Sequence, residues 1–167
     1  MASYLNVSLV GMPGVGKSTV GVLLAKRLAW GFLDTDVMIQ VIEERSLRDI
    51  IYTEGLERLA HIEQRHVLAL DRRECVIAAG CTVVYGPAAM EHLKSLGLVV
   101  HLDLPLSILE QRLAGLNGHG PVFSPGQTLH GIYQQRSPLY RHYAGVAVDC
   151  ADLTQEEIVD EIVKLMG

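Results

Sequence analysis

The chain has 167 residues, of which 49% are hydrophobic and 20% are charged, and its mean hydropathy is +0.25. This composition excludes an intrinsically disordered chain, because disordered chains lack the apolar side chains that build a core. The 14 basic and 19 acidic residues give a net charge of −5, which argues against a partner such as nucleic acid or an anionic membrane. We therefore expect one domain, residues 1–167, that binds any anionic ligand at a purpose-built local site.

The cysteines and the N-terminal residues bear on location. Three cysteines, Cys75, Cys81 and Cys150, show no C-x-x-C spacing, which argues against a disulfide framework or a zinc site and favours a reducing compartment. No basic segment followed by a long apolar core opens the sequence, and no apolar run approaches 18 residues. We expect a cytoplasmic, monomeric protein without a signal peptide.

The first half of the chain alternates short apolar runs with helical patterns. Residues 5–10 form an apolar run that ends at Gly11, which predicts a buried strand. Apolar residues at helical spacing then continue to Leu28, and a second helical pattern runs from Leu59 to about Arg72. Residues 76–79 form another short apolar run, typical of a buried strand.

The second half continues this alternation. Residues 98–102 predict a buried strand and residues 145–148 predict one more weakly, while Thr154 to Glu157 form a capping box that opens a final helix. Buried strands that alternate with helices predict an α/β domain around a parallel sheet. The stretch from Gly115 to Gly126 is rich in glycine and proline, and we expect a lid over about residues 113–127 rather than a plain surface loop.

A phosphate-binding motif follows the first predicted strand. Residues 11–18, Gly-Met-Pro-Gly-Val-Gly-Lys-Ser, match the Walker A pattern G-x-x-x-x-G-K-[ST]. Glycines let backbone N–H groups surround phosphate oxygens, and the positive end of the next helix faces the same oxygens. Lysine can reach the β- and γ-phosphates, and the serine hydroxyl can ligate Mg²⁺. We expect ATP to bind at Gly14, Val15, Gly16, Lys17, Ser18 and Thr19.

Two carboxylates, Asp34 and Asp36, follow a short apolar segment that begins at Trp30. They can cap the next helix, or they can serve a metal ion and a hydroxyl nucleophile. Phosphoryl transfer requires mainly positioning, neutralisation of charge, and a group that orients the attacking oxygen. Beside a phosphate-binding loop, the functional interpretation is the favoured one.

Three segments together resemble the shikimate kinase family. They are Gly-Met-Pro-Gly-Val-Gly-Lys-Ser-Thr-Val-Gly from Gly11, Leu-Asp-Thr-Asp from Leu33, and Arg-Ser-Pro-Leu-Tyr from Arg136. The resemblance covers nearly the whole chain. It implies a P-loop kinase fold: a three-layer αβα domain with a five-stranded parallel sheet, substrate-binding helices and a lid.

The resemblance also implies roles for single residues. Lys17 is expected to contact phosphate, and Ser18 to bind Mg²⁺ with support from Asp34. Asp36 is expected to orient or deprotonate the substrate hydroxyl. The remaining implied contacts are Arg136 with a substrate carboxylate, the Gly80 backbone with the substrate, and Arg112 with adenine.

The acceptor side departs from the family pattern at three places. Where the family has F-R-x-x-E, with an arginine that clamps the substrate carboxylate, this chain has Ala60 as the second residue of Leu-Ala-His-Ile-Glu. Arg58 lies about 200° away around a helix and does not replace it. The family triplet G-G-G reads Gly80-Cys81-Thr82, and the lid pair Arg-Pro reads Gly120-Pro121, with no Lys or Arg from residue 113 to 132.

These observations predict an ATP- and Mg²⁺-dependent kinase that phosphorylates a hydroxyl of a small carboxylate-bearing metabolite. The acceptor is either shikimate or a different molecule such as homoserine. The alternative is a nucleotide-binding regulatory module with little or no phosphotransfer. A nucleotide kinase is a weaker third possibility, because residues 113–132 offer no basic side chain for a second phosphate-bearing substrate.

Overall fold

The protein, described by a computed structural model over residues 4–116 and 123–167, is built on one parallel sheet. Five strands within these residues follow the order β2-β3-β1-β4-β5. Their bounds are β1 Asn6–Val10, β2 Gly31–Asp34, β3 Cys75–Ala78, β4 Leu98–Asp103 and β5 Val146–Asp149. The predicted five-stranded parallel α/β fold is confirmed.

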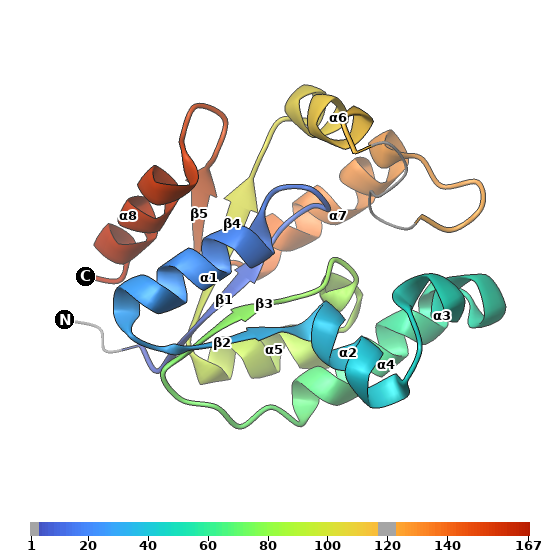
Figure 1. Cartoon of the computed structure of the whole chain (residues 1–167), viewed down its shortest axis with the longest axis horizontal. Coiled ribbons are helices and arrows are strands. Elements are labelled where there is room, and N and C mark those ends of the chain that lie inside the picture. The colour runs from blue at the N-terminus through green and yellow to red at the C-terminus, as the bar shows by residue number, and fades with distance from the viewer. Residues whose placement is uncertain (1–3, 117–122) are drawn as a thin grey trace.

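Helices cover both faces of the sheet (Figure 1). Helices α1 (Lys17–Leu28) and α8 (Gln155–Leu165) pack together on one face, and α5 (Pro87–Leu96) and α7 (Leu129–Tyr143) contact β4 on the other. Every residue of β1 is buried as a consequence. This is why the central strands read as continuous apolar runs rather than as alternating patterns.

Three further helices lie beyond the carboxyl end of β2 (Figure 1). They are α2 (Thr35–Glu43), α3 (Leu47–Glu54) and α4 (Leu56–Leu68). Their inner faces form a small apolar cluster that is separate from the main core, made of Ile39, Ile50, Ile51, Leu59 and Ile62. Helix α6 (Leu106–Ala114) lies against α7 above the carboxyl ends of the strands.

Most predicted elements are observed within a few residues of their expected bounds. The capping box at Thr154 and Glu157 is formed by both side chains, as predicted. Strand β2 was not predicted, because its four residues begin with glycine and are exposed or half-buried. Of the segment 113–127, the structure describes residues 113–116 and 123–127, so the lid stays a prediction, and Gly120 and Pro121 lie outside the described residues.

Within residues 4–116 and 123–167, no helix is both long enough and apolar enough to cross a bilayer.

Candidate active site

The loop between β1 and α1 has the backbone geometry of an anion-binding turn. Gly14 and Gly16 adopt φ angles of 82° and 102°, in the left-handed region that favours glycine. Helix α1 begins at Lys17, and no side chain caps its first turn. Its first N–H groups, together with the positive end of the helix dipole, are therefore directed at the cavity above the loop.

The side chain of Lys17 folds back over this loop. Its Nζ donates hydrogen bonds to the carbonyl oxygens of Gly11 at 2.8 Å and Met12 at 3.0 Å, and it lies 3.3 Å from Cys81 Sγ. The ammonium group therefore stands between the loop and the segment that follows β3. This is a suitable place for a cation that neutralises a phosphate group.

Asp34 has two roles, one with each carboxylate oxygen. Its Oδ1 accepts hydrogen bonds from the backbone N–H groups of Asp36 at 3.0 Å and Val37 at 3.2 Å, which makes it the N-cap of α2. Its Oδ2 accepts a hydrogen bond from Ser18 Oγ at 2.5 Å. The capping and the functional interpretations of Asp34 are therefore compatible, because each uses a different oxygen.

A cavity of about 560 Å³ lies above the phosphate-binding loop. Arg112, in the last turn of α6, reaches over the loop, and its Nη1 lies 3.2 Å from the Val15 carbonyl oxygen and 3.5 Å from that of Gly14. The Val15 side chain is buried in the core, so only its backbone is available to a ligand. The cavity is lined by Pro13, Gly14, Gly16, Lys17, Ser18, Thr19, Asp36, Cys81, Arg112, Leu113, Leu116 and Gln155.

A smaller cavity of about 110 Å³ adjoins the first on the side of α3 and α4. Asp36 lines both cavities, and so do Pro13 and Cys81. Burial raises the pKa of Asp36, while the Lys17 ammonium group opposes this shift. The smaller cavity is lined by Pro13, Asp36, Leu47, Ile51, Leu56, Leu59, Cys81, Thr82 and Arg136.

Gly80 follows β3 and allows two carboxylates to approach its backbone. A Cβ at this position would overlap the carboxylate oxygens of Glu63 and Asp36. The Gly80 N–H donates to Thr35 Oγ1 at 2.8 Å, and Thr35 Oγ1 in turn donates to Glu63 Oε1 at 3.2 Å. The requirement for glycine here is thus steric, and the expected contact of its backbone with a substrate stays a prediction.

Glu63 is a buried acid that was not among the predicted site residues; from the sequence, a contact with an ammonium-bearing substrate and a place on a solvated helix face were both open for it. Glu63 is 1% exposed. Its burial, together with the nearby charge of Asp36, raises the pKa of its carboxyl group to about 7. The hydroxyl group of Thr82 also donates a hydrogen bond to Glu63 Oε2. A signal existed in the sequence, since Leu59, Glu63 and Val67 are spaced by four and share the buried face of α4.

Tyr85, which does not line the smaller cavity, holds the side chain of Arg136. The Arg136 residue is only 3% exposed, its Nε donates to Tyr85 Oη at 3.0 Å, and its guanidinium carbon lies 5.2 Å from the centre of the Tyr85 ring. Tyr140, one turn further along α7, donates through its hydroxyl to the Cys81 carbonyl oxygen at 2.9 Å. Neither tyrosine was singled out for a contact in the site, because both interactions join distant segments.

Arg58 and Ala60 lie on α4, where the family motif places a clamping arginine at position 60. Arg58 forms an ion pair with Glu54, at 3.0 Å between Nε and Oε2. Ala60 lines a separate cavity next to Tyr85.

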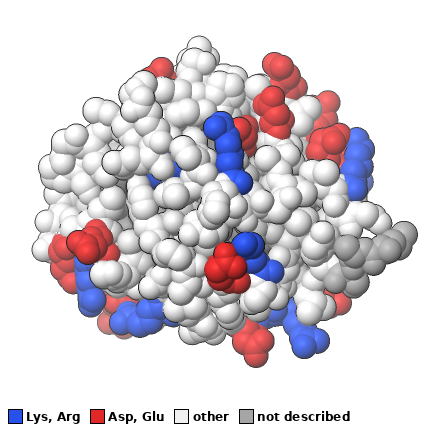
Figure 2. All heavy atoms as spheres, turned by 180° about the vertical axis from the view of Figure 1, so that it is seen from behind, with Lys and Arg blue, Asp and Glu red and all other residues white. Residues whose placement is uncertain are grey.

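The face of the molecule seen in Figure 2 carries acidic and basic side chains next to one another rather than a continuous basic patch.

Comparison with known proteins agrees with this geometry. The family model described as shikimate kinase matches residues 13–167. The chain belongs to the shikimate kinase family. A shikimate kinase of Syntrophus aciditrophicus is 36% identical over an alignment that covers 95% of this chain and 89% of the relative, and one of Microcystis aeruginosa is 35% identical, with 95% and 84% covered.

One solved structure resembles this chain in both its fold and its amino-acid sequence. The shikimate kinase of Acinetobacter baumannii in complex with shikimate superposes with a TM-score of 0.84 at 28% identity, covering 99% of this chain and 94% of that one. The shikimate kinase of Aquifex aeolicus, at 23% identity and a TM-score of 0.76, adds support for the fold alone. The expected family and fold are therefore confirmed, and the protein is an ATP-dependent kinase of a small molecule that transfers a phosphoryl group to a hydroxyl.

Proposed function

We propose that this kinase phosphorylates a hydroxyl group of a small metabolite that carries a carboxylate, with shikimate and homoserine as the two acceptors to test first. The observation that carries the proposal is the position of Asp36, which lines two cavities at once. These are the cavity of about 560 Å³ above the phosphate-binding loop, called the nucleotide cavity, and the adjoining cavity of about 110 Å³, called the acceptor cavity. A carboxylate at this junction is within reach of a hydroxyl directed at the γ-phosphate. The buried Arg136 also lines the acceptor cavity, and its guanidinium suits a carboxylate.

The transfer itself is an in-line displacement. The acceptor oxygen forms a bond to the γ-phosphorus of ATP, the bond from that phosphorus to the β,γ-bridging oxygen breaks, and ADP leaves. Asp36 takes the proton of the acceptor hydroxyl, and burial supports this role because a raised pKa makes its carboxylate a better base. Lys17 and the first N–H groups of α1 stabilise charge on the phosphates.

The residues around Ser18 fit a magnesium ion. The Ser18 hydroxyl and the Asp34 carboxylate lie 2.5 Å apart, and both are hard oxygen donors of the kind Mg²⁺ prefers. Nucleotide-bound Mg²⁺ commonly uses one or two protein oxygens together with phosphate oxygens and water. When bound, it would supply charge neutralisation on the β- and γ-phosphates, with Ser18 in direct contact and Asp34 orienting it.

Acceptor-dependent release of ADP tests the proposal. We expect one member of a panel of shikimate, homoserine and sugar acids to stimulate ADP release by at least about 100-fold over ATP alone, since binding aligns a hydroxyl that water does not replace well. Silence across a broad panel, with ATP still bound, would favour the regulatory module instead.

A further inference from the structure

A further cavity, called the second cavity below, lies beside the acceptor cavity of about 110 Å³ that Asp36 and Arg136 line. It encloses about 550 Å³ between α4 and the turn that joins η1 (Val83–Tyr85) to α5. Leu56 lines both cavities, and Tyr85, which lines the second, touches Arg136, which lines the first. The two spaces are therefore neighbours, and Leu56 and the Tyr85–Arg136 pair form the boundary between them.

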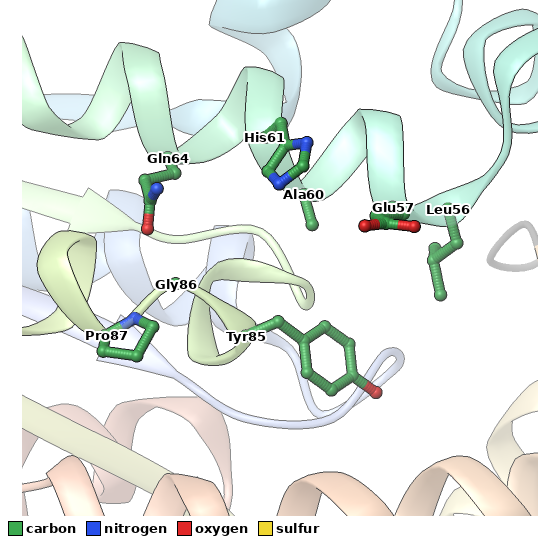
Figure 3. Close-up of a pocket in the computed structure, with 8 residues that line it drawn as sticks. All are labelled: Leu56, Glu57, Ala60, His61, Gln64, Tyr85, Gly86 and Pro87. Atoms are coloured by element: carbon green, nitrogen blue, oxygen red, sulfur yellow. The ribbon is translucent and has the colours of Figure 1, made fainter.

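Ala60 opens this second cavity. Figure 3 shows Ala60 and Glu57 on the side of α4 that faces Tyr85, with Gly86 and Pro87 on the opposite wall. The methyl group of Ala60 fills little of the space, and a long side chain at the same position would extend into it. The cavity thus exists because the residue at position 60 is small.

The lining of the cavity favours a positive ligand group. Glu57 is the one acidic residue in its lining, which also includes His61, and no Lys or Arg lines it. Among the described residues, Glu57 has no ion-pair partner, whereas Glu54, the last residue of α3, is paired with both Arg45 and Arg58. A carboxylate beside an aromatic ring attracts an ammonium group through charge and through the face of the ring, and it repels a second carboxylate.

Arg136 supplies the complementary charge at the boundary. Tyr85 engages its Nε and one face of its guanidinium, and Tyr85 Oη lies 3.4 Å from Gln135 Oε1. The positive guanidinium of Arg136 therefore lines the acceptor cavity, and the acidic side chain of Glu57 lines the second cavity. The charges on the two sides of Tyr85 are thus opposite in sign.

We propose that the second cavity is part of the acceptor site and binds an ammonium group of the acceptor, so that the acceptor is a hydroxylated amino acid rather than a hydroxy acid without an ammonium group. This inference rests on the proposed function. The acceptor carboxylate lies on Arg136, its ammonium group faces Glu57 and the ring of Tyr85, and its hydroxyl faces Asp36. Ala60 is then the residue that makes room for the ammonium end.

Matched acceptors that differ only in the ammonium group test this inference. The pairs are homoserine with 4-hydroxybutyrate and serine with 3-hydroxypropionate, with shikimate added as an acceptor without nitrogen. For at least one pair we expect kcat/KM to favour the amino acid by on the order of 30-fold or more in the parent protein, as for a charge-assisted contact. Glu57→Gln is expected to lower this preference by about tenfold through the acceptor KM, with the KM for ATP unchanged.

Two further variants make the result specific. Glu91→Gln removes an exposed carboxylate on α5 outside the cavity and is expected to leave the preference as in the parent. Ala60→Leu fills the cavity and is expected to raise the KM for the amino acid more than for its ammonium-free partner. Thermal unfolding of each variant checks that it is folded.

The possible failures are distinct. Turnover of shikimate or the ammonium-free acids with no preference for an ammonium group overturns the inference and leaves the proposed function standing. A preference that Glu57→Gln does not change also overturns it. Absence of turnover with every acceptor, while ATP is bound, contradicts the proposed function, and the inference falls with it.

Discussion

The two halves of the site are built in different ways. The nucleotide half is centred on one continuous loop and the start of α1, which offer backbone groups, Lys17 and Ser18, and Arg112 reaches over this loop from α6. The acceptor half depends on side chains from α2, α4, α7 and the segment after β3, which meet only in the folded chain. The first half has the chemistry common to many kinases, and under the proposed function the second selects the molecule that receives the phosphoryl group.

The largest expected effect comes from the nucleotide half. Lys17→Ala removes the ammonium group that stands over the phosphate-binding loop. We expect kcat/KM to fall by about 10³-fold and the affinity for ATP–Mg²⁺ to weaken by at least tenfold, because a charged donor to the phosphates is lost. Lys26→Ala, on the same helix and exposed, is the control and is expected to resemble the parent. Unchanged ATP binding in Lys17→Ala would mean that the phosphate site is assigned wrongly.

The next effect is confined to the acceptor half. Arg136→Lys keeps the positive charge but loses the planar, two-pronged donor that suits a carboxylate. We expect the KM for the acceptor to rise by about 10- to 100-fold while the KM for ATP stays within about twofold. Arg141→Lys, on the same helix with a side chain 57% exposed, is the matched control. Equal rises in both KM values would show that the two halves are not separable.

The buried acid Glu63 in the acceptor half makes the free energy of unfolding depend on pH. Because the pKa of Glu63 is about 7 in the folded chain against its usual 4.5, the folded state holds more protons between these pH values. The contribution of Glu63 to the free energy of unfolding is therefore full below about pH 4.5 and is lost as the pH rises through about 7. Glu63→Gln is expected to remove this loss, which amounts to a few kcal/mol at most.

Urea unfolding at pH 5 and pH 8 measures this difference. The parent is expected to lose more stability between the two pH values than Glu63→Gln does, while Glu91→Gln follows the parent. Parallel pH dependences in the parent and in Glu63→Gln would mean that Glu63 is not the buried acid responsible.

The same contrast explains what could be predicted from the sequence. The loop from Gly11 to Ser18 is a local motif, so its strand, its turn and the start of α1 follow from neighbouring residues alone. Asp34 was recognised as important, but its double role needed the structure, because Ser18 is 16 positions away. The contact of the Gly80 backbone with the acceptor stays a prediction, and the structure adds that Glu63 and Asp36 leave no room for a side chain at this position.

The acceptor half was predicted less completely for a physical reason. Glu63 and Thr82 are 19 positions apart, and Tyr85 and Arg136 are 51 positions apart, so neither pair leaves a pattern within one helix or strand. Their contacts come from the packing of α4, η1 and α7 around one cavity. The second cavity beside Ala60 is visible only when those elements are placed together.

The most direct test of the account follows the phosphoryl group itself. ³¹P NMR of the parent with ATP, Mg²⁺ and the stimulating acceptor is expected to show a new phosphomonoester signal that grows in step with ADP. In Asp36→Asn, this signal should appear about 10²- to 10⁴-fold more slowly while ATP remains bound, because the general base is lost. Formation of inorganic phosphate alone, or an equal rate in Asp36→Asn, would contradict the account.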